Sequence, residues 1–184
     1  MPRRMSFEPS AEIFGGSVLA LIKMMQYDEI EDVLQKYHLT EVDPDQWYPL
    51  QLTLDIIGEV ADRPNAPVNL VSLGMTAAEL GIQRLPPEKL DQTVEQALRM
   101  YGEEIYPSRH RGGDVGKIWV EHVDDNHCIV HARVPYPDDQ IYGIMYGYAR
   151  HFRPAGKSVV LAFDTDIPRH DEGGDETLIH VYIQ

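Results

Sequence analysis

The spacing of apolar residues changes near Arg111, and this change constrains the fold more than any other feature of the sequence. Before Arg111, apolar side chains recur every three or four residues, which is the period of amphipathic helices. After it, short runs alternate apolar and polar residues on either side of one helical stretch, which is typical of half-buried strands. We therefore expect an α+β protein, with a helical subregion over residues 1–110 and a sheet subregion over residues 111–184.

The first subregion is expected to consist of helices joined by polar turns. The apolar spacing predicts helices over residues 17–27, 28–37, 67–80 and 90–106. Leu90 is expected on the buried face of the last of these. A further helix is expected to begin at Asp43-Pro44 and to carry Trp47, because Asp accepts hydrogen bonds from free N–H groups and Pro suits the first helical position.

The second subregion is expected to form one sheet. Alternation predicts strands over residues 117–123, 127–134, 157–163 and 177–183, with a helix over residues 137–152. Short turns in a β-β-α-β-β order favour an antiparallel four-stranded sheet with helices on one side. Gly143 and Gly147 would let another element or a ligand approach the helix closely. The length of the chain fits a single domain over residues 1–184.

Charge and cysteine usage exclude several classes of function. The formal net charge of −14 argues against nucleic-acid or anionic-membrane partners. The only cysteine, Cys128, rules out an intrachain disulfide and a zinc site built of thiolates. The apolar run over residues 13–25 is interrupted by glycine and lysine and is too short to span a bilayer. We therefore expect a cytoplasmic protein.

The helix over residues 137–152 is unusually rich in aromatic residues and methionine. Such a helix suits one wall of an apolar pocket, here expected between that helix, the sheet and the helix over residues 90–106. Plain core packing would explain the same stripe. The residues expected to contact a ligand are apolar or aromatic side chains and three cationic anchors for a carboxylate: Trp119, Tyr142, Met145, Tyr146, Arg109, Arg150 and His151.

The polar loop over residues 164–176 is the densest group of possible metal ligands. Asp166, His170 and Asp175 could together hold a divalent cation. However, the spacing matches no calcium-binding loop, and Asp and Gly are what a solvated hairpin loop needs. His127 and His131 are expected to share one face of a strand, where exposure to water is the simpler interpretation. We assign no metal site and no catalytic residue.

Several short motifs together resemble a known family. They are Val134-Pro135-Tyr136-Pro137 before the helix, Gly143-Ile144-Met145-Tyr146-Gly147 within it, Pro154-Ala155-Gly156 after it, and Arg169-His170-Asp171-Glu172-Gly173-Gly174-Asp175 in the polar loop. This half resembles the 4-vinyl reductase domain and, more distantly, the heme–nitric oxide/oxygen-binding domain that shares its fold. The helical half is more similar to the heme-binding relatives and their heme-free cousins.

The resemblance implies a pocket for heme, aromatic effectors or acyl chains, and regulation of a partner protein or dimer rather than catalysis. Zinc-binding members carry cysteines where this chain has Asp138 and Asp139, so a zinc thiolate site is absent. Heme-binding members use an axial histidine on a helix and a Tyr-x-Ser-x-Arg motif. Residues 106–110 read Tyr-Pro-Ser-Arg-His, with His in place of the final Arg, and residues 90–106 contain no histidine. Heme ligands are therefore not carried over, and the cofactor stays unknown.

Three hypotheses follow. The favoured one is a non-enzymatic sensor or regulatory domain that binds a small apolar or amphipathic molecule and acts through a protein partner or a homodimer. The second is a protein-interaction module with a solid core and no ligand. The third is a metal-assisted enzyme that uses Asp166, His170 and Asp175, which would require those side chains to converge on a cleft.

Overall fold

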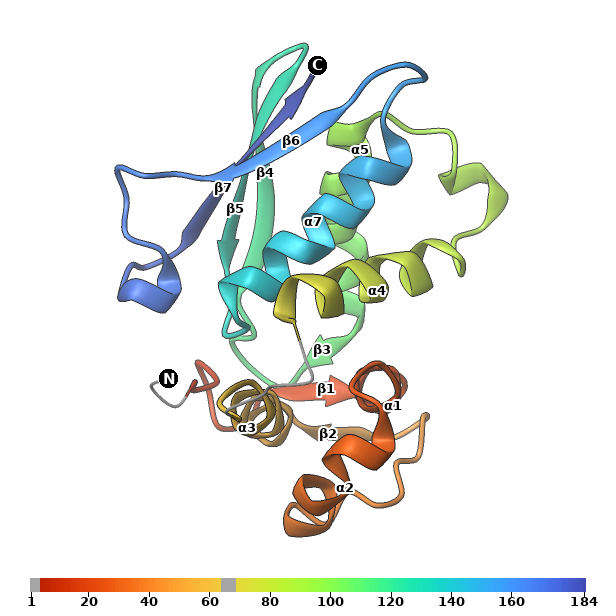
Figure 1. Cartoon of the computed structure of the whole chain (residues 1–184), viewed down its shortest axis with the longest axis vertical. Helices are drawn as coiled ribbons and strands as arrows, with labels where there is room; N and C mark the ends of the chain where they lie inside the picture. The colour runs from red at the N-terminus through yellow and green to blue at the C-terminus, as the bar shows by residue number, and fades with distance from the viewer. Residues whose placement is uncertain (1–3, 64–68) are drawn as a thin grey trace.

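The computed structural model describes residues 4–63 and 69–184, and its larger sheet has the predicted antiparallel form. The strands are β4 (Lys117–Asp124), β5 (His127–Arg133), β6 (Val159–Phe163) and β7 (Thr177–Ile183), in the order β4-β5-β7-β6. Helix α7 (Asp138–Phe152) crosses one face of this sheet, as Figure 1 shows. The α+β class and the β-β-α-β-β order are confirmed.

Alternation along the central strands decides which face of the sheet is covered. On β5, Cys128, Val130 and Ala132 are buried, while the residues between them are partly exposed. In the antiparallel register, Val130 lies opposite Ile179 of β7, which is also fully buried. Apolar side chains from both central strands therefore form one surface, against which helix α7 and its neighbours pack.

Glycines bring helix α4 (Leu70–Ile82) into backbone contact with α7. A β-carbon at Gly74 would lie 2.1 Å from the carbonyl oxygen of Gln140, and one at Gly143 would lie 2.1 Å from that of Val71. The expected close approach at Gly143 is thus confirmed, and the approaching element is a helix. The helix predicted over residues 67–80 corresponds to α4, and Pro67 lies outside the described residues.

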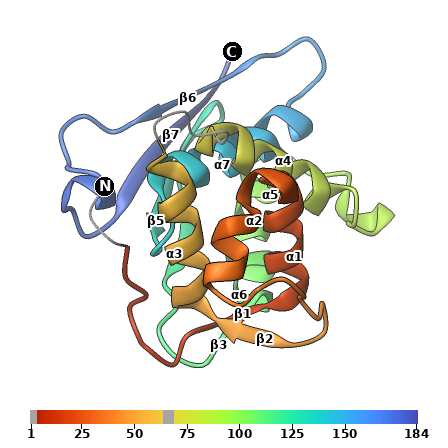
Figure 2. The same cartoon turned by 60° about the horizontal axis from the view of Figure 1, so that its bottom comes forward.

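The N-terminal part contains three helices and a second sheet (Figure 2). The helices are α1 (Gly15–Met24), α2 (Tyr27–Lys36) and α3 (Leu50–Ala61). The strands are β1 (Glu12–Phe14), β2 (Trp47–Pro49) and β3 (His110–Arg111), in the antiparallel order β2-β1-β3. This sheet was not predicted, because strands of two or three residues are too short to show alternation. Within the described residues, no helix is both long enough and apolar enough to cross a membrane.

The helix start expected at Asp43-Pro44 is wrong. The Asp43 carboxylate accepts a hydrogen bond from the backbone N–H of Asp45 at 2.9 Å, which closes a turn in place of a helix N-terminus. The chain then enters strand β2, so Trp47 lies on a strand, and the helix begins only at Leu50. Asp favours turns and helix starts through the same side-chain hydrogen bond, so the residue alone does not separate them.

The helix expected over residues 90–106 begins later and changes its winding. It consists of α5 (Val94–Met100), a π-helical turn η2 (Tyr101–Ile105) and α6 (Tyr106–Ser108), and it follows the short 3-10 helix η1 (Pro87–Lys89). The inward position expected for Leu90 is wrong: its side chain is 45% exposed, because it precedes the helix.

The N-terminus of α5 is set by a capping box. The Thr93 hydroxyl accepts from the backbone N–H of Gln96, and the Gln96 side chain accepts from the backbone N–H of Thr93. Replacing Thr93 with alanine should lower the free energy of unfolding by about 1 kcal/mol, because an N–H group of the first turn loses its acceptor. Urea denaturation measures the difference. Thr93→Ser keeps the hydroxyl and should unfold close to the wild-type midpoint.

Candidate functional site: a cavity between the helices

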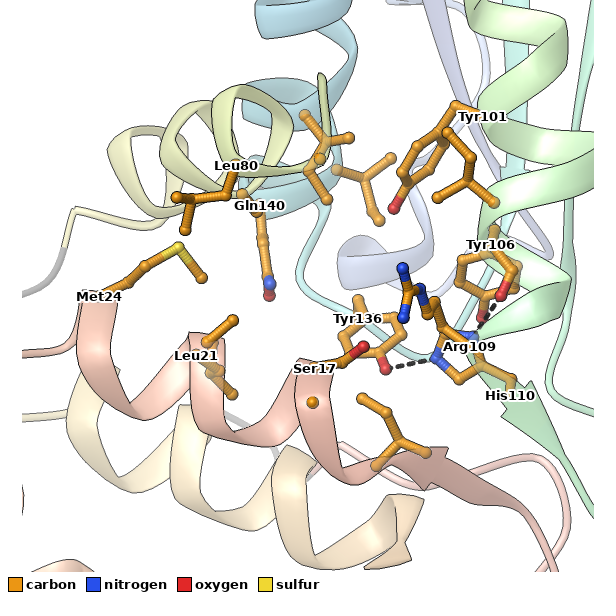
Figure 3. A pocket seen from close by; sticks show the side chains of 18 of the residues that line it. Ser17, Leu21, Met24, Leu80, Tyr101, Tyr106, Arg109, His110, Tyr136 and Gln140 are labelled. Atoms are coloured by element: carbon orange, nitrogen blue, oxygen red, sulfur yellow. Dashed lines mark hydrogen bonds between the residues drawn. The ribbon is translucent and has the colours of Figure 1, made fainter. Parts of the chain in front are cut away.

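A cavity of about 160 Å³ lies where the N-terminal helices meet the sheet subregion. Helix α1 forms one wall, α4 and α7 form the second, and η2 with the residues that follow it forms the third (Figure 3). Much of the lining is aliphatic or thioether side chain: Leu21, Met24, Ala77, Leu80, Ile141 and Ile144. A hydrocarbon group would therefore find a favourable environment there.

The position of this cavity differs in part from the expectation. Helix α7 and the segment after α5 do line it, as expected. Helices α1 and α4 take the place expected for the sheet, and strands β4 to β7 contribute no lining residue among those described. The sheet is excluded because its inner face is already covered by apolar packing against the helices.

Tyr101, the first residue of the π-helical turn, projects into the cavity. Next to it, Gly102 brings the turn against strand β4, where a β-carbon would lie 2.4 Å from the carbonyl oxygen of Ile118. The Tyr101 hydroxyl points into the open space (Figure 3), and its ring centroid lies 5.2 Å from that of Tyr148 on α7. Burial raises the pKa of Tyr101 well above its ordinary value, so this hydroxyl keeps its proton and can donate a hydrogen bond.

Several polar atoms at the cavity have no hydrogen-bond partner within the described part of the chain. They are Tyr148 Oη, Gln140 Oε1 and Thr53 Oγ1. Each such atom costs about 1–3 kcal/mol when it is buried without a partner. Burial also raises the pKa of Tyr148 to about 12, although the nearby Arg109 charge lowers it. A ligand that offered hydrogen-bonding atoms would relieve this cost.

A neutral histidine fixes one corner of the cavity. His110 Nδ1 lies 2.7 Å from the carbonyl oxygen of Tyr106, to which it donates, and Nε2 lies 2.7 Å from the Tyr136 hydroxyl, from which it accepts. Desolvation lowers the pKa of His110 to about 4. The Tyr106 hydroxyl in turn donates to the carbonyl oxygen of Val115. This corner is therefore a set of uncharged, mutually satisfied groups.

Arg109 supplies a positive charge beside that corner. Its side chain extends into the cavity (Figure 3), and its guanidinium carbon lies 5.6 Å from the ring centroid of Phe14. No carboxylate among residues 4–63 and 69–184 is within ion-pair distance of it. By contrast, Arg111, two residues later, pairs with Glu12 at 2.7 Å. Arg109 is the one expected ligand contact that lines this cavity.

The other aromatic and apolar candidates for ligand contact lie away from the cavity. Trp119 is on the outer face of the sheet, stacked on His131 with ring centroids 4.7 Å apart. The Tyr142 hydroxyl donates to the carbonyl oxygen of Leu161 at 2.9 Å. Met145 is a fully buried core residue, and Tyr146 is partly buried against the core. These four side chains are not brought together at one site.

The two cationic candidates on α7 are also elsewhere. Arg150 and His151 are exposed and line shallow surface grooves at the C-terminal end of the helix. Sequence reasoning did not single out Tyr101 and Tyr148, which line the cavity and whose hydroxyls have no hydrogen-bond partner within the described part of the chain. Their helical spacing favoured plain core packing, and both face the cavity in the folded chain.

The polar loop over residues 164–176 does not bring Asp166, His170 and Asp175 together as possible metal ligands. His170 lies with Asp138 and Asp171, where one ligand atom of each falls within 4.8 Å of the others, while Asp166 and Asp175 are exposed. Asp171 is already paired with Arg4 and accepts from the backbone N–H of Asp138. These contacts join the N-terminus of α7 to the loop, so the group serves the fold.

The histidines of β5 and the single cysteine are accounted for by their local surroundings. His127 and His131 share the outer face of β5, as expected; His127 Nε2 lies 2.9 Å from His180 Nδ1, and His131 lies between Glu121 and Glu176. Burial raises the pKa of the Cys128 thiol to about 12, which suits an inert core cysteine.

The order and packing of these elements define the H-NOX-like fold, the class that contains heme–nitric oxide/oxygen-binding domains. Neither family models nor curated proteins match the sequence. Among solved structures, an S. oneidensis H-NOX protein in the Fe(II)NO state has a TM-score of 0.69 at 14% identity, covering 94% of this chain and 99% of its own. An oxygen-binding H-NOX domain related to soluble guanylate cyclases has a TM-score of 0.66 at 13% identity, covering 92% and 94%. At these identities the likeness shows the fold alone.

The cavity does not fit heme. Axial ligands to heme iron are His, Cys, Met or Tyr side chains. His110 uses both ring nitrogens in hydrogen bonds, and burial raises the pKa of each described tyrosine of the lining, which opposes a phenolate ligand. Met24 is then the one side chain of these kinds left among the described lining residues, and Met serves as an axial ligand beside a His. The volume, about 160 Å³, is close to that of an engineered cavity that holds one benzene ring, whereas a porphyrin joins several rings.

Proposed function

We propose that this protein is a sensor or regulatory domain that binds a small apolar or amphipathic molecule in the cavity between α1, α4, η2 and α7. The observation that carries the proposal is a mostly apolar cavity, lined by polar groups that have no hydrogen-bond partner among residues 4–63 and 69–184. Buried polar groups without a partner lower the stability of a core. A role in ligand binding would explain why they are present here. A cavity of this size also favours a ligand-binding domain over an interaction module with a solid core.

The cavity lies between two parts of the molecule, which suggests how binding would be communicated. A ligand there contacts α1 on one side and α7 on the other, so its binding energy depends on how the two parts are placed. We propose that the single domain passes this change to a protein partner or a second copy in the cytoplasm, without catalysis. The 4-vinyl reductase resemblance points to the same regulatory role.

Filling the cavity tests the proposal directly. Toluene, a neutral one-ring probe, should raise the melting temperature of the wild-type protein, because a ligand that binds only the folded state stabilises it. Ala77→Phe places a ring inside the cavity and should abolish this shift. Ala162→Phe, on the exposed side of β6, is the matched control and should retain it. A toluene response that is absent in the wild type, or unchanged in Ala77→Phe, would contradict a binding role for this cavity.

A further inference from the structure

The charge inside the cavity narrows the chemistry of the ligand. The sequence has 30 acidic and 16 basic residues, so a cation has many possible partners. Arg133 pairs with Asp114 at 2.8 Å and Arg169 with Glu172 at 2.8 Å, whereas Arg109 has no such partner among the described residues. A half-buried guanidinium in an apolar setting is costly unless an anion meets it. An anionic ligand in the cavity would supply that partner.

The groups around Arg109 act as hydrogen-bond donors. The Tyr148 hydroxyl, near Arg109, and the Tyr101 hydroxyl both keep their protons at neutral pH, because burial raises the pKa of each. Neutral hydroxyls beside a guanidinium can all donate to one negatively charged oxygen pair. No Asp or Glu is among the described residues that line the cavity, so nothing there would repel an anion.

The number of charges points to a monoanion. His110 remains neutral and has both ring nitrogens occupied, so it adds no second positive charge. Arg84 also lines the cavity but is exposed at its rim, where water screens its charge. The planar guanidinium of Arg109 matches a carboxylate through two parallel hydrogen bonds. The aliphatic wall and the tilted rings of Tyr101 and Tyr148 suit an apolar body about the size of one ring.

We propose that the ligand is an apolar monocarboxylate of about one-ring size, with its carboxylate bound by Arg109 and the hydroxyls of Tyr101 and Tyr148. This inference rests on the proposed function and assigns the chemical class of the molecule bound. It also identifies Arg109, among the three cationic side chains that the sequence suggested, as the anchor.

Two compounds with the same ring separate the carboxylate from the apolar body: phenylacetate and 2-phenylethanol. Isothermal titration calorimetry should show tighter binding of phenylacetate to the wild-type protein, by roughly 10- to 100-fold, because a hydrogen-bonded charge pair is replaced by a neutral contact. Arg109→Met should remove this preference and leave 2-phenylethanol binding within about threefold. Arg109→Lys keeps the charge without the paired geometry and should give an intermediate value.

The control is Arg150→Met, which removes an equal charge from the exposed face of α7, outside the cavity, and should leave both affinities unchanged. Equal binding of the two compounds by the wild-type protein would overturn the proposal, as would unchanged phenylacetate binding in Arg109→Met or binding of neither compound. The toluene measurement decides separately whether the cavity binds ligands at all. Circular dichroism spectra that match the wild type establish that each variant is folded.

Discussion

Replacing Gly143 with alanine should lower the free energy of unfolding by about 3 kcal/mol. The added methyl group would lie 2.1 Å from the carbonyl oxygen of Val71, and backbone atoms of a packed helix cannot move aside as a flexible side chain can. Alanine is intrinsically about 1 kcal/mol better than glycine inside a helix, so a loss of stability would measure the contact between helices and not helix propensity.

The matched control is Gly58→Ala, in the middle of α3. No atom lies within 4 Å of a β-carbon built at Gly58, so only the propensity term acts there. This variant should gain up to about 1 kcal/mol. Urea denaturation, with the slope compared between variants, measures both changes. Equal stability of the two variants would contradict backbone contact between α4 and α7.

Stability should fall between pH 6.5 and pH 4 by an amount that depends on His110. Desolvation by burial lowers the pKa of His110 from its ordinary value of 6.5 to about 4 in the folded protein. As the pH falls below 6.5, His110 becomes protonated in the unfolded chain but stays neutral in the folded chain. Proton binding therefore favours the unfolded state. The full contribution of this group, about 3 kcal/mol, is present above pH 6.5 and is lost as the pH approaches 4.

Urea denaturation at several pH values between 4 and 7 tests this effect. His110→Gln should be less stable than the wild type at pH 7 and should show a shallower fall towards pH 4, because the titrating group is gone. His151→Gln, at an exposed position on α7, should keep the wild-type pH dependence. A wild-type slope that persists in His110→Gln would show that other groups cause it.

Sequence periodicity predicted the four-stranded sheet and helix α7 because each of these elements spans several periods of its pattern. It failed at the short strands of the second sheet and at Asp43, where one kind of side-chain hydrogen bond serves both a turn and a helix start. Arg109 was named because a charge beside an apolar helix is visible in the sequence, and the structure places it at the cavity. Tyr101 was missed because its spacing is that of a buried helix position, and the cavity beside it is formed by helices that lie far apart in the sequence.

The glycine contacts between α4 and α7 also determine which elements would move together if a ligand displaced one of them. Gly74 and Gly143 each lie against the backbone of the opposite helix, so the two helices have little freedom to slide or separate. A ligand that displaced α4 from within the cavity would therefore displace α7 as well, because the two helices form one rigid unit packed on the sheet.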